Sequence, residues 1–175
     1  KPIQAGDLDN SDSHKVKSQI SNPKSQIFEN SYQLNTPASP HFAAELDGIT
    51  IDLKKIKEPK TQNHLIIEGA GGVLVPLNDT DCMVDIIQPD YKVIVVSRHY
   101  LGSINHTLLT LDVLKQNGIK VKCIVFNGDV VPSSLEVIIK RSDVKDYYLL
   151  PTIEEVSEES IHKIADEWKD SFHAE

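Results

Sequence analysis

Three short apolar runs, rich in β-branched residues and bounded by turn residues, constrain the fold of this chain more than any other feature. The runs are Leu65–Ile67, Val93–Val96 and Cys123–Phe126. Continuous apolar runs of this length are typical of strands that are buried on both faces, as in parallel sheets covered by helices. We therefore expect each run to be a buried strand.

Segments with helical spacing of apolar residues follow these runs. The pattern predicts helices over Ser103–Asn117 and Ser133–Arg141, a short strand at Tyr147–Leu150, and a last helix that begins at Ser157. The side chains that we expect the last helix to bury are Ile161, Ile164, Ala165 and Trp168. Alternating strands and helices predict an α/β fold: a doubly wound, mostly parallel sheet flanked by helices with right-handed crossovers.

The first third of the chain has weaker signals. Residues 1–36 are polar and predict loop with one short helix around Ser13–Gln19. The stretch from Ser39 to Gly48 predicts a helix, with Ser39 as its cap, Pro40 in its first turn and Gly48 at its end. With 175 residues, we expect a single domain over 1–175.

Composition excludes several classes of function. The net charge is −8 and the lysines are scattered among acidic residues, which argues against a nucleic-acid partner. No apolar run approaches the roughly 18 residues of a membrane span, and no secretory signal is visible. Cys82 and Cys123 lack metal-ligand partners nearby and are interpreted as free thiols, so we expect a cytoplasmic protein.

The strongest candidate site is the segment Glu68–Gly72, which follows the first apolar run directly. Ligands of open parallel sheets bind beyond the carboxyl ends of the strands. A carboxylate there can hold Mg²⁺, and glycines let the backbone approach a phosphate closely. The alternative is a glycine-rich turn with a solvated glutamate.

Other candidates are individually ambiguous. Leu101–His106 enters a predicted helix, whose free N–H groups suit a carboxylate or phosphate. Taken alone, this segment is more typical of an ordinary Ser-capped helix start. His106 is a possible base or a structural histidine. Asn127 presents a donor and an acceptor to a purine edge or simply forms a turn with Gly128. Asp12 is a possible second metal carboxylate or ordinary loop polarity.

Taken together, these segments resemble the dethiobiotin synthetase family. The matching pieces, in the family's order, are Lys1–Gly6, Asn10–Asp12, Ser39–His41, Ile67–Gly72 with Pro76–Leu77, Leu101–Thr110 and Phe126–Asn127. Each piece alone is weak. The succession of Glu-Gly-Ala-Gly-Gly and Leu-Gly-x-Ile-Asn-His is specific, and the pieces cover nearly the whole chain.

The resemblance implies a ligase that closes the cyclic urea of dethiobiotin from 7,8-diaminononanoate and CO₂, with ATP and Mg²⁺ as cofactors, through a carbamate that ATP phosphorylates. It also implies a homodimer. By similarity, Asp12 and Glu68 would hold Mg²⁺ and Lys1 would neutralise charge near the γ-phosphate. The residues implied around the substrate are Gly69, Ala70, Gly71, Ser39 and Pro40, with Gly102, Ser103 and Asn105 receiving its carboxylate across the dimer interface. Asn127 would recognise adenine, with Pro151 and Glu155 in the loop that closes this pocket.

The chain departs from the family pattern in two ways. No G-x-x-x-x-G-K-[ST] phosphate loop occurs in the sequence, so we expect that this loop and the first strand of a P-loop NTPase-like fold precede Lys1 in the complete protein. Ala5 stands where relatives carry Ser or Thr. Two other enzyme or ATPase types share the fold, the amidoligases and the partition-type switch ATPases. An amidoligase would carry a glutaminase domain with a reactive cysteine, and nothing in this sequence suggests one. A switch ATPase would lack the Gly-Ser-Ile-Asn-His motif, which this chain has. A non-catalytic, degenerate paralogue that binds a metabolite or nucleotide is the alternative function.

Overall fold

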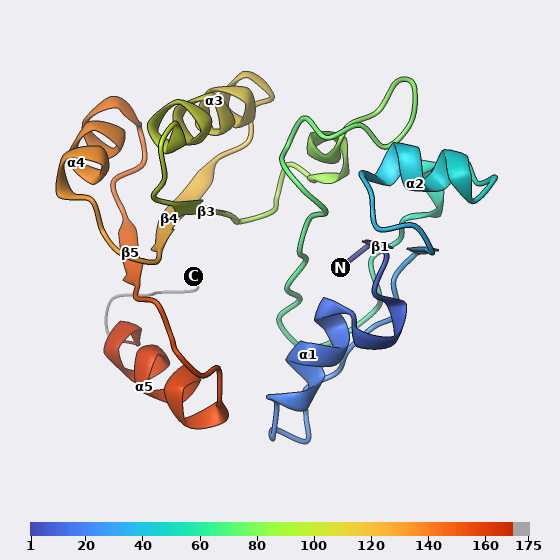
Figure 1. Cartoon of the computed structure of the whole chain (residues 1–175), viewed down its shortest axis with the longest axis horizontal. Coiled ribbons are helices and arrows are strands. Elements are labelled where there is room, and N and C mark those ends of the chain that lie inside the picture. Colours follow the sequence, from blue (N-terminus) through green and yellow to red (C-terminus); the bar gives the residue numbers. More distant parts are fainter. Residues whose placement is uncertain (170–175) are drawn as a thin grey trace. The chain divides into compact units, whose positions relative to one another are not determined.

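Parallel strands form two separate sheets in the computed structural model, which describes residues 1–169 of the chain (Figure 1). The contacts within the chain divide it into two units, Lys1–Gln88 and Pro89–Glu175. Each unit has its own sheet and its own helices, and the two are described in turn. Parallel sheets flanked by helices confirm the predicted α/β class.

The first unit contains a two-stranded sheet that the sequence did not predict. Strand β1 (Ile3–Ala5) pairs in parallel with β2 (Tyr32–Leu34). The helix that connects them, α1 (Asp12–Ser18), confirms the predicted short helix. The two strands escaped prediction because three residues are too few to show an alternating pattern within a polar segment.

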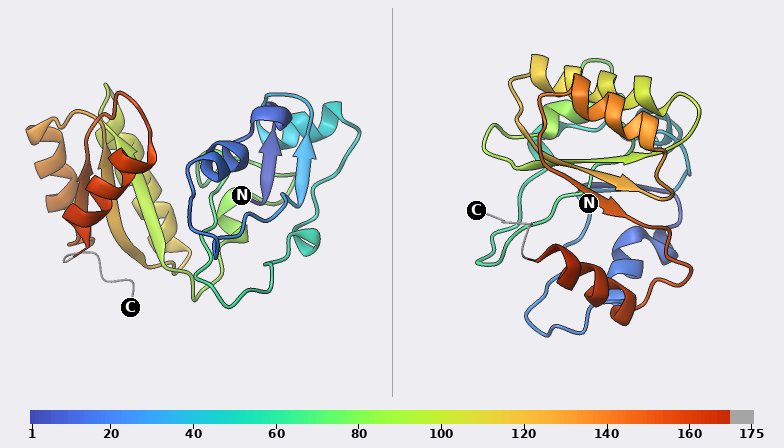
Figure 2. Two further views of the ribbon diagram at one scale, coloured as in Figure 1. Left: turned by 90° about the horizontal axis from the view of Figure 1, so that it is seen from below. Right: turned by 90° about the vertical axis from the view of Figure 1, so that its left-hand side faces the viewer.

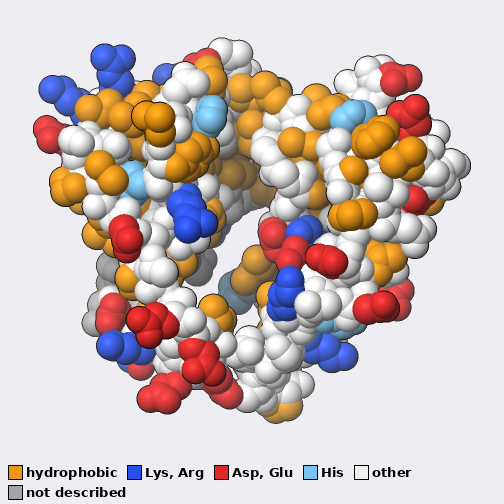
Figure 3. All heavy atoms as spheres, in the orientation of Figure 1, with side chains coloured by type: hydrophobic (Ala, Val, Ile, Leu, Met, Phe, Trp, Pro, Cys, Tyr) orange, Lys and Arg blue, Asp and Glu red, His pale blue; other side chains and the backbone are white. Residues whose placement is uncertain are grey.

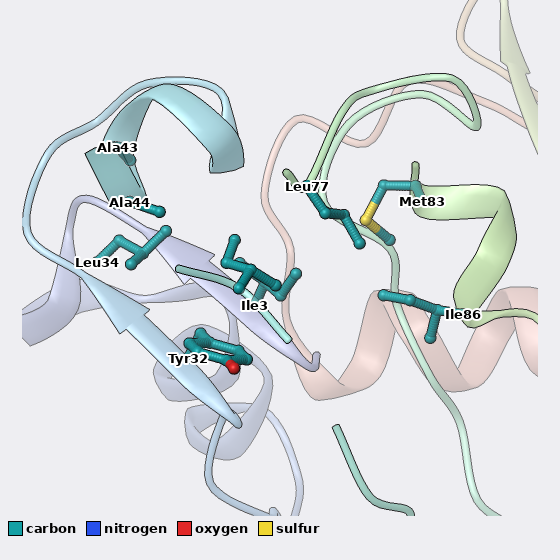
Figure 4. Close-up of a cluster of buried hydrophobic side chains, with 9 residues drawn as sticks. Ile3, Tyr32, Leu34, Ala43, Ala44, Leu77, Met83 and Ile86 are labelled. Carbon is teal, nitrogen blue, oxygen red and sulfur yellow. The ribbon is translucent and has the colours of Figure 1, made fainter. Parts of the chain in front are cut away.

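A cluster of buried apolar side chains on one side of this sheet stabilises the first unit (Figure 4). Helix α2 (Pro40–Leu46), which the punctuation of the sequence predicted, packs against the strands. Gly48 adopts the positive φ of 66° that ends such a helix. Three 3₁₀ turns, η1 (Leu8–Asn10), η2 (Leu53–Lys55) and η3 (Met83–Ile86), complete the unit. The buried members of the cluster are Ile3, Tyr32, Leu34, Ala43, Ala44, Ile51, Leu77, Met83 and Ile86.

The prediction of a buried strand at Leu65–Ile67 was wrong. The segment lies outside every strand of the structure, and Ile66 is 89% exposed. A strand needs a neighbour to accept and donate its backbone hydrogen bonds, and no described segment pairs with this one. An apolar run alone therefore did not make a strand here.

The second unit follows the predicted order of strands and helices closely. Its elements are β3 (Val93–Arg98), α3 (Ser103–Gln116), β4 (Val121–Asn127), α4 (Pro132–Arg141), β5 (Tyr147–Leu150) and α5 (Glu158–Trp168). The three strands are parallel, in the order β3-β4-β5. Helices α3 and α4 lie together on one face of this sheet, and α5 lies on the other side (Figure 2).

Burial in the second unit differs from the prediction in two places. Strand β4 is buried on both faces, but β3 is buried only toward α3, and Ile94 and Val96 are 43% and 64% exposed. Helix α5 has no buried residue. Its Trp168 ring contacts Tyr148 of β5, with ring centroids 5.2 Å apart, while Ile161 is exposed. Of the side chains that were expected to be buried, Ile164 and Trp168 are half-buried, while Ile161 and Ala165 are exposed.

The surface carries both signs of charge. In the view of Figure 3, acidic and basic side chains are interspersed, with no broad basic patch on that face. Both cysteines are free thiols, as predicted, with Cys123 buried and Cys82 only partly buried. Among the residues that the structure describes, no helix is long and apolar enough to cross a membrane.

Candidate functional site

The first unit brings Lys1, Asp12 and Glu68 together. The Lys1 ammonium donates hydrogen bonds to Asp12 Oδ2 and, at 3.4 Å, to Glu68 Oε1. Strand β1 begins two residues after Lys1. Helix α1 begins at Asp12, and the buried Ser11 is the N-terminal cap of this helix. Asp12 and Glu68, which are 11 and 67 positions from Lys1 in the sequence, therefore both lie beside its ammonium group.

Their mutual interactions favour the charged forms of Lys1 and Asp12. Burial by itself would lower the pKa of the Lys1 ammonium, but the hydrogen bond to Asp12 and the charges of Glu68 and Asp12 raise this pKa above its ordinary value. The hydrogen bond from Lys1, helped by the positive charge of Lys15 at 3.9 Å, holds the pKa of Asp12 below its ordinary value. The Lys1 side chain is only 14% exposed, whereas that of Glu68 is 60% exposed.

The pair of carboxylates fits a magnesium ion by its donor chemistry. Mg²⁺ is usually bound by one or two carboxylates together with water and substrate phosphates. Asp12 and Glu68 already converge on one cation, the Lys1 ammonium. Within residues 1–169, no group of three or more acidic, histidine or cysteine side chains is placed to hold a metal ion.

The glycine segment after Glu68 has close neighbours. A Cβ on Gly69 would lie 3.2 Å from the Met83 side chain, and Gly71 has a φ of 85°. A Cβ on Gly71 would lie 2.9 Å from Val75, so a larger residue there is disfavoured both by backbone and by space. Ala70 packs at the edge of the apolar cluster. The exposed backbone of Gly69 and Gly71 is thus held in place by the core.

Ser39 and Pro40 begin α2 on the loop that follows β2. Pro40 is buried and Ser39 is exposed, and the Ser39 side chain makes no capping hydrogen bond. The same loop packs tightly on the end of β1, where a Cβ on Gly6 would lie 2.5 Å from Pro37 Cβ. The contact holds the loop that carries Ser39 against the end of β1.

In the second unit, helix α3 begins with the predicted carboxylate-binding residues. Gly102 is the N-terminal cap with a φ of 101°, Ser103 is 2% exposed, and Asn105 is exposed. Because Ser103 is buried, its hydroxyl is less accessible than the resemblance implied. A feature that the sequence did not reveal is the hydrogen bond of 2.7 Å between the Tyr100 hydroxyl and His106 Nδ1, which gives His106 a structural partner.

Asn127 and Pro151 lie at the carboxyl ends of the neighbouring strands β4 and β5. Asn127 is the last residue of β4 and is in register with Leu150 of β5, directly before Pro151. The backbone N–H of Gly128 donates to the Leu150 carbonyl at 2.8 Å. Glu155 lies farther along the exposed loop, where its carbonyl accepts a hydrogen bond from Ser160 near the start of α5.

Comparisons with known proteins place the chain among its relatives. A family model described as an AAA domain matches residues 1–160. A relative from Christiangramia forsetii is 56% identical over 83% of this chain and 70% of its own length. Others from Cytophaga hutchinsonii and Rhodopseudomonas palustris are 45% and 36% identical over 96% and 100% of this chain, and 84% and 83% of their own lengths. All three are named ATP-dependent dethiobiotin synthetase.

The identities and coverage of these relatives and the family model over most of the chain establish the family. The chain belongs to the family of ATP-dependent dethiobiotin synthetases, with the α/β fold of P-loop NTPase-like proteins.

Proposed function

We propose that this protein forms dethiobiotin from 7,8-diaminononanoate, CO₂ and ATP, with Mg²⁺ as the metal cofactor. The observation that carries the proposal is the convergence of Lys1, Asp12 and Glu68. Transfer of a phosphoryl group requires mainly positioning and neutralisation of charge. One ammonium and two carboxylates at one point supply the means for both.

Asp12 and Glu68 would hold the metal ion, which when bound neutralises phosphate charge. Lys1, whose pKa is raised, stays protonated through the physiological range and provides a fixed positive charge beside them. Because the Lys1 side chain has low exposure, water screens its charge less, and its attraction for nearby anions is stronger. In the proposed reaction the ammonium faces the γ-phosphate and the carbamate, which are both anionic, and brings them into reach of each other.

The diamine would lie along the exposed backbone of Gly69–Gly71, with Ser39 and Pro40 as further neighbours. The absence of side chains at the two glycines lets a reacting group approach the main chain. The substrate carboxylate would bind at the N-terminus of α3, at Gly102, Ser103 and Asn105, on the partner subunit of a homodimer. Helix N-termini favour anions through free N–H groups and the helix dipole.

The adenine base would bind at Asn127, whose amide can both donate to and accept from a purine edge. Pro151 and the loop that contains Glu155 would close this pocket. The position at the carboxyl ends of β4 and β5 supports the proposal, because ligands of parallel sheets bind at this edge.

The experiment is an assay of the protein expressed from its complete gene. Diamine, bicarbonate, ATP and MgCl₂ are supplied, and dethiobiotin and phosphate are measured by mass spectrometry and a phosphate sensor. We expect one phosphate per cyclic urea and no product when any component is omitted. Binding of ATP or diamine without product would instead support a non-catalytic paralogue. Light scattering tests the dimer, since a strict monomer contradicts the shared carboxylate site.

A further inference from the structure

Strands β3, β4 and β5 end side by side, and the last residue of β3 is an arginine. Arg98 is in register with Asn127, and Asn127 is in register with Leu150. Residues in register on neighbouring parallel strands point to the same face of the sheet. Because Ser97 bonds to Thr107 of α3, Arg98 lies on the opposite face, together with Asn127.

The Arg98 side chain reaches across to the neighbouring strand end. A Cβ on Gly128 would lie 3.9 Å from Arg98 Nε and 3.8 Å from Thr152 Oγ1. Gly128 has a φ of 97°, which few residues with side chains adopt. Arg98 and Thr152 thus approach the bare backbone of Gly128 from the two flanking segments, directly after Asn127.

The charge of Arg98 has no protein partner within residues 1–169. The ion pairs of these residues involve Lys1, Lys15, Lys115, His162 and Lys169. Arg98 is exposed and forms none of them, although acidic residues outnumber basic ones by 26 to 18 in the chain. A solvated surface arginine usually projects away from the protein, whereas this one lies along a strand end beside an amide.

A guanidinium beside an amide suits one kind of ligand in particular. The group is planar and weakly hydrated, and it stacks on aromatic rings. The Asn127 amide can bond to the edge of a heterocyclic base, and a planar cation on the same sheet face is then placed for the face of that base. A phosphate would use the charge of Arg98 but not its plane.

We propose that Arg98 is a nucleotide-binding residue whose guanidinium stacks on the base that Asn127 recognises. This inference rests on the proposed function, because it takes ATP as the ligand at Asn127. It adds a third strand end to the base site and predicts that the arginine contributes through its planar shape as well as its charge.

The test is direct binding of ATP and of inorganic tripolyphosphate, by calorimetry, to the protein expressed from its complete gene. Arg98→Met weakens ATP binding roughly 3- to 30-fold, the range expected for a cation stacked on an aromatic ring, and leaves tripolyphosphate binding unchanged. Arg98→Lys recovers only part of the loss, because it restores charge without the plane. Arg141→Met, at the exposed end of α4, is the matched control and binds both ligands normally. In turnover, the KM for ATP rises and the KM for the diamine does not.

Other outcomes separate this inference from the proposed function. If Arg98→Met binds ATP normally while Asn127→Ala loses it, the role of Arg98 is refuted and the base site stands. Equal losses for ATP and tripolyphosphate would show a phosphate contact and refute stacking. If the unaltered protein neither binds ATP nor forms dethiobiotin, the proposed function itself fails. Circular dichroism of each variant establishes that it is folded, and Arg98→Gln replaces any variant that is not.

Discussion

Replacement of Glu68 by glutamine separates the catalytic role of this carboxylate from any role in folding. The substitution removes one negative charge and keeps the size of the side chain. In the structure Glu68 makes one ion pair, with Lys1 Nζ at 3.4 Å, and its side chain is 60% exposed. Lys1 retains its stronger partner, Asp12, in the variant.

The structure indicates a small effect on stability. Two unit charges at this separation attract each other by about 1 kcal/mol in a water-like dielectric, and exposed pairs contribute about 0–1 kcal/mol after screening and side-chain entropy. We therefore expect Glu68→Gln to lower the free energy of unfolding by less than about 1 kcal/mol. For a chain of this length the melting temperature would fall by less than about 4 °C.

The expected effect on activity is far larger. If Glu68 holds the metal ion, its loss should reduce Mg²⁺-dependent kcat/KM at least about 100-fold, since even the residues that only support metal ligands contribute 10- to 100-fold. Phosphate release is measured against MgCl₂ concentration, with thermal melts in parallel. Glu45→Gln, which removes an exposed carboxylate of α2, is the control. Turnover of Glu68→Gln at the normal rate and normal Mg²⁺ concentration would refute the assignment to the metal site. A loss of several kcal/mol of stability would show instead that Glu68 has a structural role.

Three further predictions concern stability. Asp12→Asn should lower the free energy of unfolding near neutral pH by up to about 1 kcal/mol, because the pKa of Asp12 is depressed in the folded state. The loss is measured as a lower melting temperature. This contribution is complete above the unfolded pKa of about 3.9 and is lost as pH falls through the lower folded value. A difference between the melts of the variant and the original protein that does not shrink as pH falls below about 3.9 would contradict the reasoning. Leu34→Ala should cost about 2–5 kcal/mol in urea denaturation, because Leu34 is fully buried; a cost below 1 kcal/mol would show that the cluster is loosely packed. Gly48→Ala should cost about 1–2 kcal/mol for its positive φ alone, and Gly6→Ala about 1–3 kcal/mol more, because its Cβ would also collide with Pro37. Equal losses for the two alanine variants, measured in the same urea titration, would exclude the steric contribution.

The sequence by itself determined the elements of the second unit. Val93–Val96 and Cys123–Phe126 lie within β3 and β4, and Tyr147–Leu150 coincides with β5. The helix after β3 ends at Gln116, directly before Asn117 and Gly118. These features were predictable because apolar period, β-branched composition and turn residues act locally, within a few positions of each other.

The tertiary structure decided which apolar runs are buried and which charges meet. Leu65–Ile67 is a short apolar run like those within β3 and β4, but no described strand lies beside it, and Ile66 is exposed as a result. The meeting of Lys1 with Glu68, across 67 positions, and the pairing of β1 with β2 likewise depend on long-range contacts. The family motifs pointed to the ionic residues, yet no local pattern encodes a distance between them, because hydrogen-bond ladders and ion pairs form between segments that only the folded chain brings together.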